Sequence, residues 1–370
     1  MQTIFGYCVF LIVAYFALQL FVILYQIVNY RRKNVRKPIE GNFPKVSILI
    51  PVRNEETNIV KCLQSIAQLS YPKDKLQVLI GNDGSTDGTV KLVDTFIADK
   101  SQFKFFNISV NLGKAKGKAN ALAHLAQLSE GDFLFFTDAD TTVNVDWVEQ
   151  MLAHFEAKTG VVCGTTLVEG TNLLGHMQSL DWLFFTGVIN AFANAGVAST
   201  GVGNNMAVRR EAYLSVGGFE NLDFSITEDF KLYNAIIKEN WGWKNILNRQ
   251  TLNASKAAPD FRTLLNQRKR WLTGAMDLPL QWKVVFVMFG FFAPSLLVVF
   301  FFGWQLGLYI WLIKFMLEAV YMTILSARLN KAQLLNYLLA YQFYGLFMPG
   351  ITVIKFFNGK PNVWKDRTYA

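Results

Sequence analysis

The sequence predicts an α/β domain with a mostly parallel, doubly wound sheet, joined to transmembrane helices. In the middle of the chain, short β-branched or aromatic runs alternate with helical segments, as in sheets whose strands are buried on both faces. Residues 1–30, 284–313 and 332–354 contain no Asp, Glu, Lys or Arg, and a span of the hydrocarbon core needs ~20 apolar residues. Charged residues make up only 17% of the chain, which also indicates an integral membrane protein.

The order of elements in the central region follows from these runs. Strands are expected at residues 46–52, 76–83, 103–110 and 133–137, and helices at 57–69, from the GSTDGT turn toward residue 96, and at 118–128. In parallel sheets of this kind, ligands bind at the carboxyl ends of the strands. Polar residues follow three of the expected strands: Arg53, Asn54 and Glu55, then Asn82, Asp83 and Gly84, then Asp138 and Asp140.

The first apolar stretch is expected to be an uncleaved anchor. It has no basic segment before it, its apolar core is too long for a signal peptide, and no small-residue cleavage site follows. The basic segment at residues 31–37 comes directly after it, and basic residues beside a span mark the cytoplasmic side. We therefore expect the central domain to be cytoplasmic, at an inner or plasma membrane.

Net charge and cysteine content narrow the function classes. The net charge of +9 fits an anionic membrane surface. Because the basic residues flank the apolar stretches and form no separate stripe, we expect no nucleic-acid partner. The three cysteines are far apart and odd in number, so they predict neither a disulfide framework nor a metal cluster.

The last apolar stretch leaves two alternatives open. Met348-Pro349-Gly350 interrupts it, so it either crosses the membrane or is re-entrant or interfacial, and the second alternative would keep the basic tail in the cytoplasm. The expected organisation is an anchor (1–30), a basic linker (31–44), a catalytic domain (45–260), an interfacial segment (261–283), a transmembrane region of two spans plus this third segment (284–357) and a basic tail (358–370).

The stretch FLFFTDADTT places two carboxylates, Asp138 and Asp140, directly after a buried strand. Residues i and i+2 of an extended segment point the same way, so the two acids repel each other unless a cation lies beside them. Mg²⁺ and Mn²⁺ prefer carboxylate oxygens and often complete their coordination with substrate phosphates. The sequence therefore predicts a metal-bound diphosphate, against the alternative of ordinary turn chemistry.

Four further sites carry candidate chemistry, each with a structural alternative. Asp83 lies at a strand end, where it can bind a base or ribose or cap a turn. Lys118 begins a helix, where a phosphate would be favoured, or it belongs to a solvated loop. Either Glu228 or Asp229 in SITEDF acts as a general base, or both acids lie at a solvent-facing helix start. In NQRKRW, either the arginines bind phosphate and the tryptophan stacks on a sugar or base, or the segment anchors the chain at the membrane surface.

The histidines and one pair of charged residues are expected to have structural roles, and an aromatic segment has two possible roles. The three histidines, His124, His154 and His176, show no ligand spacing. Lys314 and Glu318 are four residues apart in an apolar helix and predict a local ion pair. The aromatic segment at residues 181–192 either lines an acceptor path or packs in a core.

Taken together and in this order, the motifs resemble those of the membrane-bound family 2 glycosyltransferases with a Rossmann-like GT-A fold, such as ceramide glucosyltransferase and the hyaluronan, chitin and cellulose synthases. The resemblance covers roughly residues 45–271 and the flanking apolar layout. It rests on VSILIPVRNEE, GNDGSTDGT, GKANAL, FFTDADTTV, GNNMAVRREAYLSVGGF, TED and QRKRW.

The resemblance implies roles for individual residues. Asp83 would contact the nucleotide, Asp138 and Asp140 would form the D-x-D element with Mg²⁺ or Mn²⁺, and Asp229 beside Glu228 would be the catalytic base. The other implied substrate-binding residues are Glu55, Lys118, Gln267, Arg268, Arg270 and Trp271. The usual acidic pair before the Gly-Ser turn is here Asn82-Asp83, a departure that affects the nucleotide-binding detail.

The implied reaction is an inverting transfer of a sugar from a nucleotide-sugar, expected to be a UDP-sugar, to a hydroxyl group, which forms a β-linkage. We expect a lipid or lipid-linked acceptor, because three or four spans are too few to enclose a polymer channel in one chain. The alternative is a processive polysaccharide synthase that works with a partner subunit or as an oligomer. A remote alternative is a non-catalytic sugar-nucleotide sensor or a transporter component.

Overall fold

The computed structural model describes residues 2–30, 41–198, 200–276, 278–358, 362–365 and 367–369. The basic segment at 31–37 and part of the basic tail therefore lie outside the described residues. The chain forms two compact units, which we call the sheet unit (Lys33–Val168 and Phe192–Lys256) and the helical unit (Met1–Arg32, Glu169–Ala191 and Ala257–Ala370). Residues 169–191, which the sequence placed in the catalytic domain, thus group with the apolar helices.

The sheet unit is built on a seven-stranded sheet with the order β3-β2-β1-β4-β8-β6-β9. Strands β1 to β4 are parallel, whereas β8 runs antiparallel to both β4 and β6. A smaller sheet has the order β5-β10-β7. The strands are β1 (Val46–Val52), β2 (Leu76–Asn82), β3 (Phe103–Asn107), β4 (Phe133–Phe136), β5 (Thr141–Thr142), β6 (Thr159–Cys163), β7 (Thr165–Glu169), β8 (Met206–Arg209), β9 (Gly242–Asn245) and β10 (Leu252–Lys256).

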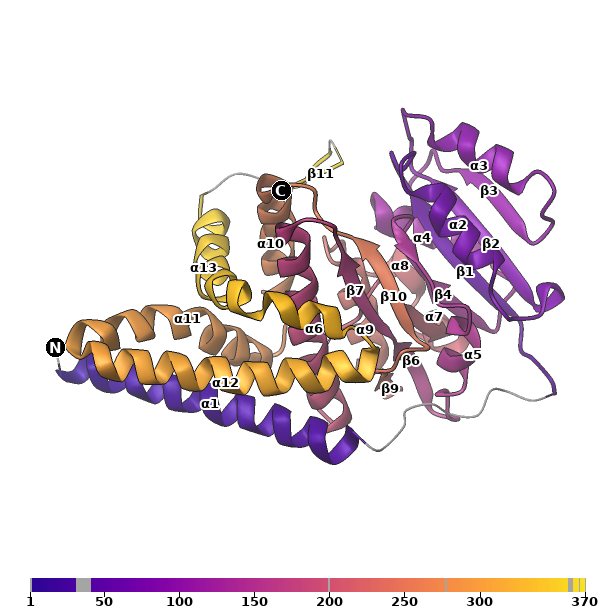
Figure 1. The fold of residues 1–370 in the computed structure, drawn as a ribbon. Helices are drawn as coiled ribbons and strands as arrows, with labels where there is room; N and C mark the ends of the chain where they lie inside the picture. Colours follow the sequence, from indigo (N-terminus) through magenta and orange to yellow (C-terminus); the bar gives the residue numbers. More distant parts are fainter. Residues whose placement is uncertain are drawn as a thin grey trace. The chain divides into compact units, whose positions relative to one another are not determined.

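Helices cover this sheet, as the parallel strand order requires. They are α2 (Ile59–Ala67), α3 (Thr89–Ile97), α4 (Lys118–Gln127), α5 (Trp147–Leu152), α7 (Arg210–Ser215), α8 (Gly218–Asn221) and α9 (Glu228–Lys238), with a short 3₁₀ turn, η1 (Lys73–Lys75). Figure 1 shows α2 and α4 beside β1 and β2. The expected alternation of strand and helix is confirmed, with element ends within a few residues of those predicted.

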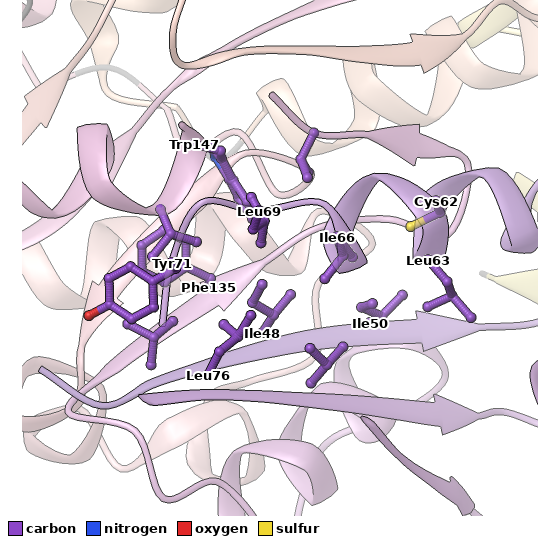
Figure 2. Close-up of a cluster of buried hydrophobic side chains, with 14 of the residues drawn as sticks. Ile48, Ile50, Cys62, Leu63, Ile66, Leu69, Tyr71, Leu76, Phe135 and Trp147 are labelled. Atoms are coloured by element: carbon purple, nitrogen blue, oxygen red, sulfur yellow. The ribbon is translucent and has the colours of Figure 1, made fainter. Parts of the chain in front are cut away.

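Strand β1 shows why the expected buried run is apolar throughout. Ile48 and Ile50 pack on one face of the sheet with Leu63 and Ile66 of α2, and Figure 2 shows this cluster. Leu49, one residue along, belongs to the cluster on the opposite face. Because side chains alternate along a strand, a strand covered on both faces needs apolar residues at consecutive positions. The same argument applies to β4, whose four residues are all buried.

The helical unit contains the apolar stretches. Among the described residues, four helical segments are long and apolar enough to cross a membrane: Thr3–Asn29, Leu280–Phe302, Trp304–Leu329 and Ala332–Phe356. Figure 1 shows α1 and α12 running alongside each other, and both contact α11. The unit consists of α1 (Gln2–Tyr30), α6 (Leu173–Asn194, up to Ala191), α10 (Phe261–Ala275), α11 (Leu280–Phe302), α12 (Trp304–Leu329), η2 (Ala332–Tyr337), α13 (Leu338–Phe356) and the hairpin β11 (Asn362–Trp364) and β12 (Arg367–Tyr369).

Two features of the last apolar stretch bear on the sequence expectations. Helix α13 continues through Pro349. The expected interruption at Met348-Pro349-Gly350 is therefore absent from this helix. Large apolar side chains on α13 are exposed, for example Phe347 at 60% and Ile354 at 73%. Such a surface is stable against lipid rather than water. Whether this segment crosses the membrane or is re-entrant stays a prediction.

Polar groups inside the helical unit pair with one another. Lys314 Nζ lies 2.8 Å from Glu318 Oε2, so the expected local ion pair is confirmed. The network extends to other helices, because Tyr15 of α1 donates to Glu318 Oε1 at 2.9 Å and Gln342 of α13 donates to Glu318 Oε2 at 2.8 Å. In the aromatic segment at 181–192, Phe184 is buried against Phe289 and Tyr321, which supports core packing at that position.

Candidate active site

The carboxyl ends of β1, β2 and β4 lie at one edge of the main sheet because the three strands are parallel neighbours. The loops that follow them are tied together. The Arg53 guanidinium donates to the Asp83 carbonyl oxygen at 2.5 Å, and the Asn54 N–H donates to Ser85 Oγ at 3.0 Å. Asn54 has a φ of 50°, a left-handed conformation that Asn tolerates better than most residues. This edge is where parallel α/β sheets bind ligands.

Two predicted substrate-binding residues lie at this edge. Asp83 is buried, and its N–H donates to the Val52 carbonyl oxygen at 2.9 Å. Glu55 Oε2 accepts a hydrogen bond from Asn58 Nδ2 at 2.7 Å, and the Glu55 N–H donates to Thr89 Oγ1 at 2.8 Å. Glu55 therefore helps to shape the loop that leads into α2.

The unusual Asn82 has a structural explanation. Its Nδ2 donates to Asn107 Oδ1 at 2.8 Å, and its Oδ1 accepts from the Ser85 N–H at 2.9 Å. A carboxylate has no N–H to donate, so an acid at this position could keep the contact with the neighbouring strand only if the Asn107 amide turned to donate its own N–H. The amide thus joins β2 to β3 and begins the turn after Asp83.

Lys118 brings two of the predicted motifs together. It is the first residue of α4, and its Nζ lies 2.7 Å from Asp138 Oδ1 and 2.9 Å from Glu228 Oε1. The D-x-D element after β4 and the TED segment at the start of α9 are far apart in the sequence. One ammonium group therefore joins them in a single site. The acids of this site raise the pKa of Lys118 despite its burial, so the side chain stays protonated.

Asp229 is held in a fixed orientation beside this ammonium. Its Oδ2 accepts from the Gly203 N–H at 2.8 Å, and its Oδ1 accepts from the Phe230 N–H at 2.8 Å. Burial and the neighbouring Glu228 raise the pKa of Asp229 to about 6, against the opposing effects of Lys118 and the two backbone N–H groups. A carboxyl group with a pKa near neutrality is suited to accept a proton during catalysis.

Asp140 completes the acidic side of the site. Its Oδ1 accepts from Thr141 Oγ1 at 3.2 Å and from Ser255 Oγ of β10 at 3.4 Å. Among the described residues, no group of three or more His, Cys, Asp or Glu side chains could hold a metal ion. Asp138 and Asp140 supply two carboxylates, which fits a cation that takes its remaining ligands from water and substrate phosphate.

The NQRKRW residues belong to the helical unit, on α10. Arg268 Nη2 forms an ion pair with Asp181 of α6 and contacts Tyr344 Oη of α13 at 3.5 Å. Its guanidinium also lies over the Trp271 ring, 5.0 Å from the centroid. Gln267 and Arg270 lie on the same helix and are partly exposed.

Sequence reasoning did not assign roles to Asp181 or Gly203. Asp181 is the one charged residue of α6, and a lone acid in an otherwise apolar helix was a signal for a buried ionic partner. Gly203 lies in the segment GVGNN, where a Cβ would come within 2.8 Å of the Asp229 side chain. Nothing in the local sequence indicates that close approach, because it depends on a residue at the start of a different helix.

Comparison with known proteins identifies the family. The model of glycosyl transferase family 21 matches residues 11–370. The chain belongs to this family. The resemblance to membrane glycosyltransferases is therefore confirmed, and the chain is a family 21 glycosyltransferase.

Relatives of this family 21 glycosyltransferase include enzymes named for a lipid product and for a polysaccharide product. A β-monoglucosyldiacylglycerol synthase of Nostoc sp. is 28% identical over 66% of this chain and 52% of its own length. A poly-β-1,6-N-acetyl-D-glucosamine synthase of Staphylococcus epidermidis is 28% identical over 53% of this chain and 46% of its own length. The family 21 chain thus spans about half the length of these relatives.

A solved structure shows the fold. The mannosyltransferase PcManGT from Pyrobaculum calidifontis, in complex with GDP-mannose and Mn²⁺, matches 95% of this family 21 chain and 97% of its own, with a TM-score of 0.59 and 17% identity. The expected α/β architecture of the GT-A type is therefore confirmed.

Proposed function

We propose that this protein is an inverting glycosyltransferase that moves a sugar from a nucleotide-sugar, preferably a UDP-sugar, to a hydroxyl group of a lipid or lipid-linked acceptor at the cytoplasmic membrane face, forming a β-linkage. The observation that carries the proposal is the position of Lys118 Nζ, 2.7 Å from Asp138 Oδ1 and 2.9 Å from Glu228 Oε1. This contact brings the D-x-D acids, which are suited to hold a cation for the donor diphosphate, beside the acids of the TED segment, which are suited to remove a proton.

Asp229 is the proposed general base. Two backbone N–H groups orient its carboxylate, and its pKa of about 6 leaves it mostly ionised at neutral pH. It takes the proton of the acceptor hydroxyl while that oxygen forms a bond to the anomeric carbon. The bond from that carbon to the diphosphate oxygen breaks on the opposite face, and its electron pair leaves with the diphosphate, so the configuration inverts. Glu228 holds Lys118 and adds negative charge beside the base.

The donor would be bound by the loops at the sheet edge. Asp83, with Glu55 in the neighbouring loop, suits the nucleoside, and Lys118 suits the diphosphate. Asp138 and Asp140 are the proposed ligands of Mg²⁺ or Mn²⁺, which when bound neutralises charge on the diphosphate. The neighbour of known structure binds Mn²⁺ with GDP-mannose, which supports a divalent cation. Gln267, Arg268, Arg270 and Trp271 of α10 are proposed to act on the diphosphate and the acceptor.

A lipid acceptor is favoured over a polymer. One relative is named as a synthase of β-monoglucosyldiacylglycerol, and the four candidate spans among the described residues are few for enclosing a polysaccharide channel. The second candidate is a processive polysaccharide synthase acting with a partner subunit or as an oligomer. The relative named as a poly-β-1,6-N-acetyl-D-glucosamine synthase is the specific observation in its favour.

The deciding experiment uses the full chain reconstituted in lipid with Mg²⁺ or Mn²⁺, a panel of radiolabelled UDP- and GDP-sugars, and membrane extract as the acceptor source. We expect label in a discrete lipid species, which identifies donor and acceptor class together. A ladder of high molecular weight would assign the protein to the polysaccharide synthases. No transfer from any donor would contradict the proposal.

Isosteric variants test the individual roles. Asp229→Asn should lower transfer by about 10²–10⁴-fold because no base remains. Asp140→Asn should lower transfer and raise the concentration of Mg²⁺ or Mn²⁺ needed for it, because a carboxylate ligand is lost. Asp94→Asn, on the exposed side of α3, is the matched control and should retain full transfer. Wild-type transfer by Asp229→Asn or Asp140→Asn would remove the corresponding assignment.

A further inference from the structure

Two consecutive residues of α6 contact the two most distinctive residues of the QRKRW segment. Asp181 forms an ion pair with Arg268, and the Trp182 ring meets the Trp271 ring edge-on at a centroid distance of 5.5 Å. All four residues belong to the helical unit. Arg268 and Trp271 are three positions apart on α10, so they occupy the same face of that helix. Asp181 and Trp182 therefore both contact the face of α10 that carries Arg268 and Trp271.

The ion pair is enclosed. The side chains of Arg268 and Asp181 are only 15% and 11% exposed. Asp181 Oδ1 accepts a further hydrogen bond from Tyr341 Oη at 3.3 Å. Burial lowers the pKa of Arg268, but Asp181 and the neighbouring tyrosines outweigh this and raise it. Asp181 therefore stabilises the charged guanidinium in its enclosed site.

These contacts do not provide an acceptor for every N–H donor of the guanidinium. Its Nη2 contacts Asp181 and Tyr344, whereas its buried Nε has no hydrogen-bond partner among the described residues. A buried donor without an acceptor is costly, and a guanidinium presents its donors in a rigid fork. An anionic oxygen is the ligand that such a fork recognises best.

We propose that Asp181 is a positioning residue that holds Arg268 in the orientation needed for transfer. This inference rests on the proposed function, in which Arg268 stabilises negative charge that builds on the leaving diphosphate. Asp181 touches neither donor nor acceptor in this account. It holds one end of the guanidinium through the ion pair, while the guanidinium also lies over the Trp271 ring, which the Trp182 ring contacts edge-on.

The test measures sugar transfer by the full chain in lipid, with kcat and the KM for the donor determined separately. Asp181→Asn should lower kcat about tenfold to a hundredfold, because small displacements of a catalytic group have effects of this size. Asp181→Glu keeps the charge and should recover most of the rate. Glu169→Gln is the matched control, since it neutralises another acid of the helical unit that pairs with Lys331 at 2.9 Å, and it should leave kcat unchanged.

A double-variant cycle separates positioning from folding. If Asp181 acts through Arg268, then Asp181→Asn should have little further effect on kcat once Arg268→Gln is present. Additive losses of kcat would overturn the proposal, and so would wild-type kcat in Asp181→Asn or a loss of kcat that follows the amount of folded protein in a thermal unfolding assay. Absence of transfer by the wild-type chain would instead contradict the proposed function, so the two failures are distinguishable.

Discussion

Lys118 shows how one side chain determines the electrostatics of the candidate site. Four acids, Asp138, Asp140, Glu228 and Asp229, belong to the D-x-D and TED motifs, and Lys118 contacts two of them directly. The motifs themselves could be predicted, because each has a recognisable local pattern. The contact between them could not, because Asp138 and Glu228 are brought together by the packing of α4 and α9 on the same face of the sheet.

The rate of transfer should depend on the ionisation of Asp229. Because its pKa is raised to about 6, the protonated, inactive form predominates below pH 6 and the ionised base predominates above it. We therefore expect kcat to rise by about tenfold per pH unit below pH 6 and to level off above it. A pH–rate profile measures this, and a profile with no acidic limb near pH 6 would contradict the assignment of the base.

At the scale of elements, the segment before β8 positions the start of α9. The Gly203 N–H donates to Asp229 Oδ2 at 2.8 Å, and a Cβ at residue 203 would lie 2.8 Å from the Asp229 Cβ and Oδ2. The two backbones can approach this closely because Gly203 has no side chain. The short segment thus acts as a support for the carboxylate.

Gly203→Ala should therefore move the Asp229 carboxylate and lower kcat about tenfold to a hundredfold. Steady-state kinetics on the variant measures the loss. Gly290→Ala is a suitable control, because a Cβ there meets nothing within 4 Å, and it should retain normal transfer. An unchanged kcat in Gly203→Ala would show that the site tolerates a displaced carboxylate.

The buried ion pair between Lys314 and Glu318 of α12 links this helix to its neighbours in the helical unit. Lys314 and Glu318 are 5% and 4% exposed, and Gln342 of α13 contacts both of them. Lys314→Met should destabilise the protein by about 3–5 kcal/mol, because it leaves a buried carboxylate without its counter-ion. The double variant Lys314→Met/Glu318→Leu should be more stable than the single one. Thermal unfolding in detergent compares them, and a double variant less stable than Lys314→Met would refute this explanation.

At the scale of the whole molecule, the four apolar segments bear on topology. In the part of the chain that the structure describes, one candidate span precedes the whole sheet unit in the sequence and three follow it. With a cytoplasmic sheet unit, three crossings would place the C-terminus outside, whereas a re-entrant last segment would keep it inside. The continuity of α13 through Pro349 shows that the sequence interruption is no obstacle to a full crossing.

Of the alternatives left open for the last segment, we predict the re-entrant one, because basic residues follow it and positive charge favours the cytoplasmic side. A reporter fused after Ala370 should therefore be cytoplasmic. A second reporter inserted at residue 41, directly after the basic segment, should also be cytoplasmic and serves as the control. An external reporter after Ala370 would contradict the re-entrant prediction and support a full crossing.

The sequence by itself determined the order of strands and helices from β1 to β4, the apolar stretches and the candidate motifs. Each of these depends on residues close together in the chain, such as the apolar run of β1 or the two acids that follow β4. Only the tertiary structure decided which motifs meet. The bridge from Lys118 to Asp138 and Glu228, the contact of Gly203 with Asp229 and the pairing of Asp181 with Arg268 all join distant segments. Such contacts depend on how helices and strands pack against each other, and hydrophobic periodicity specifies only that a face is buried, not which partner covers it.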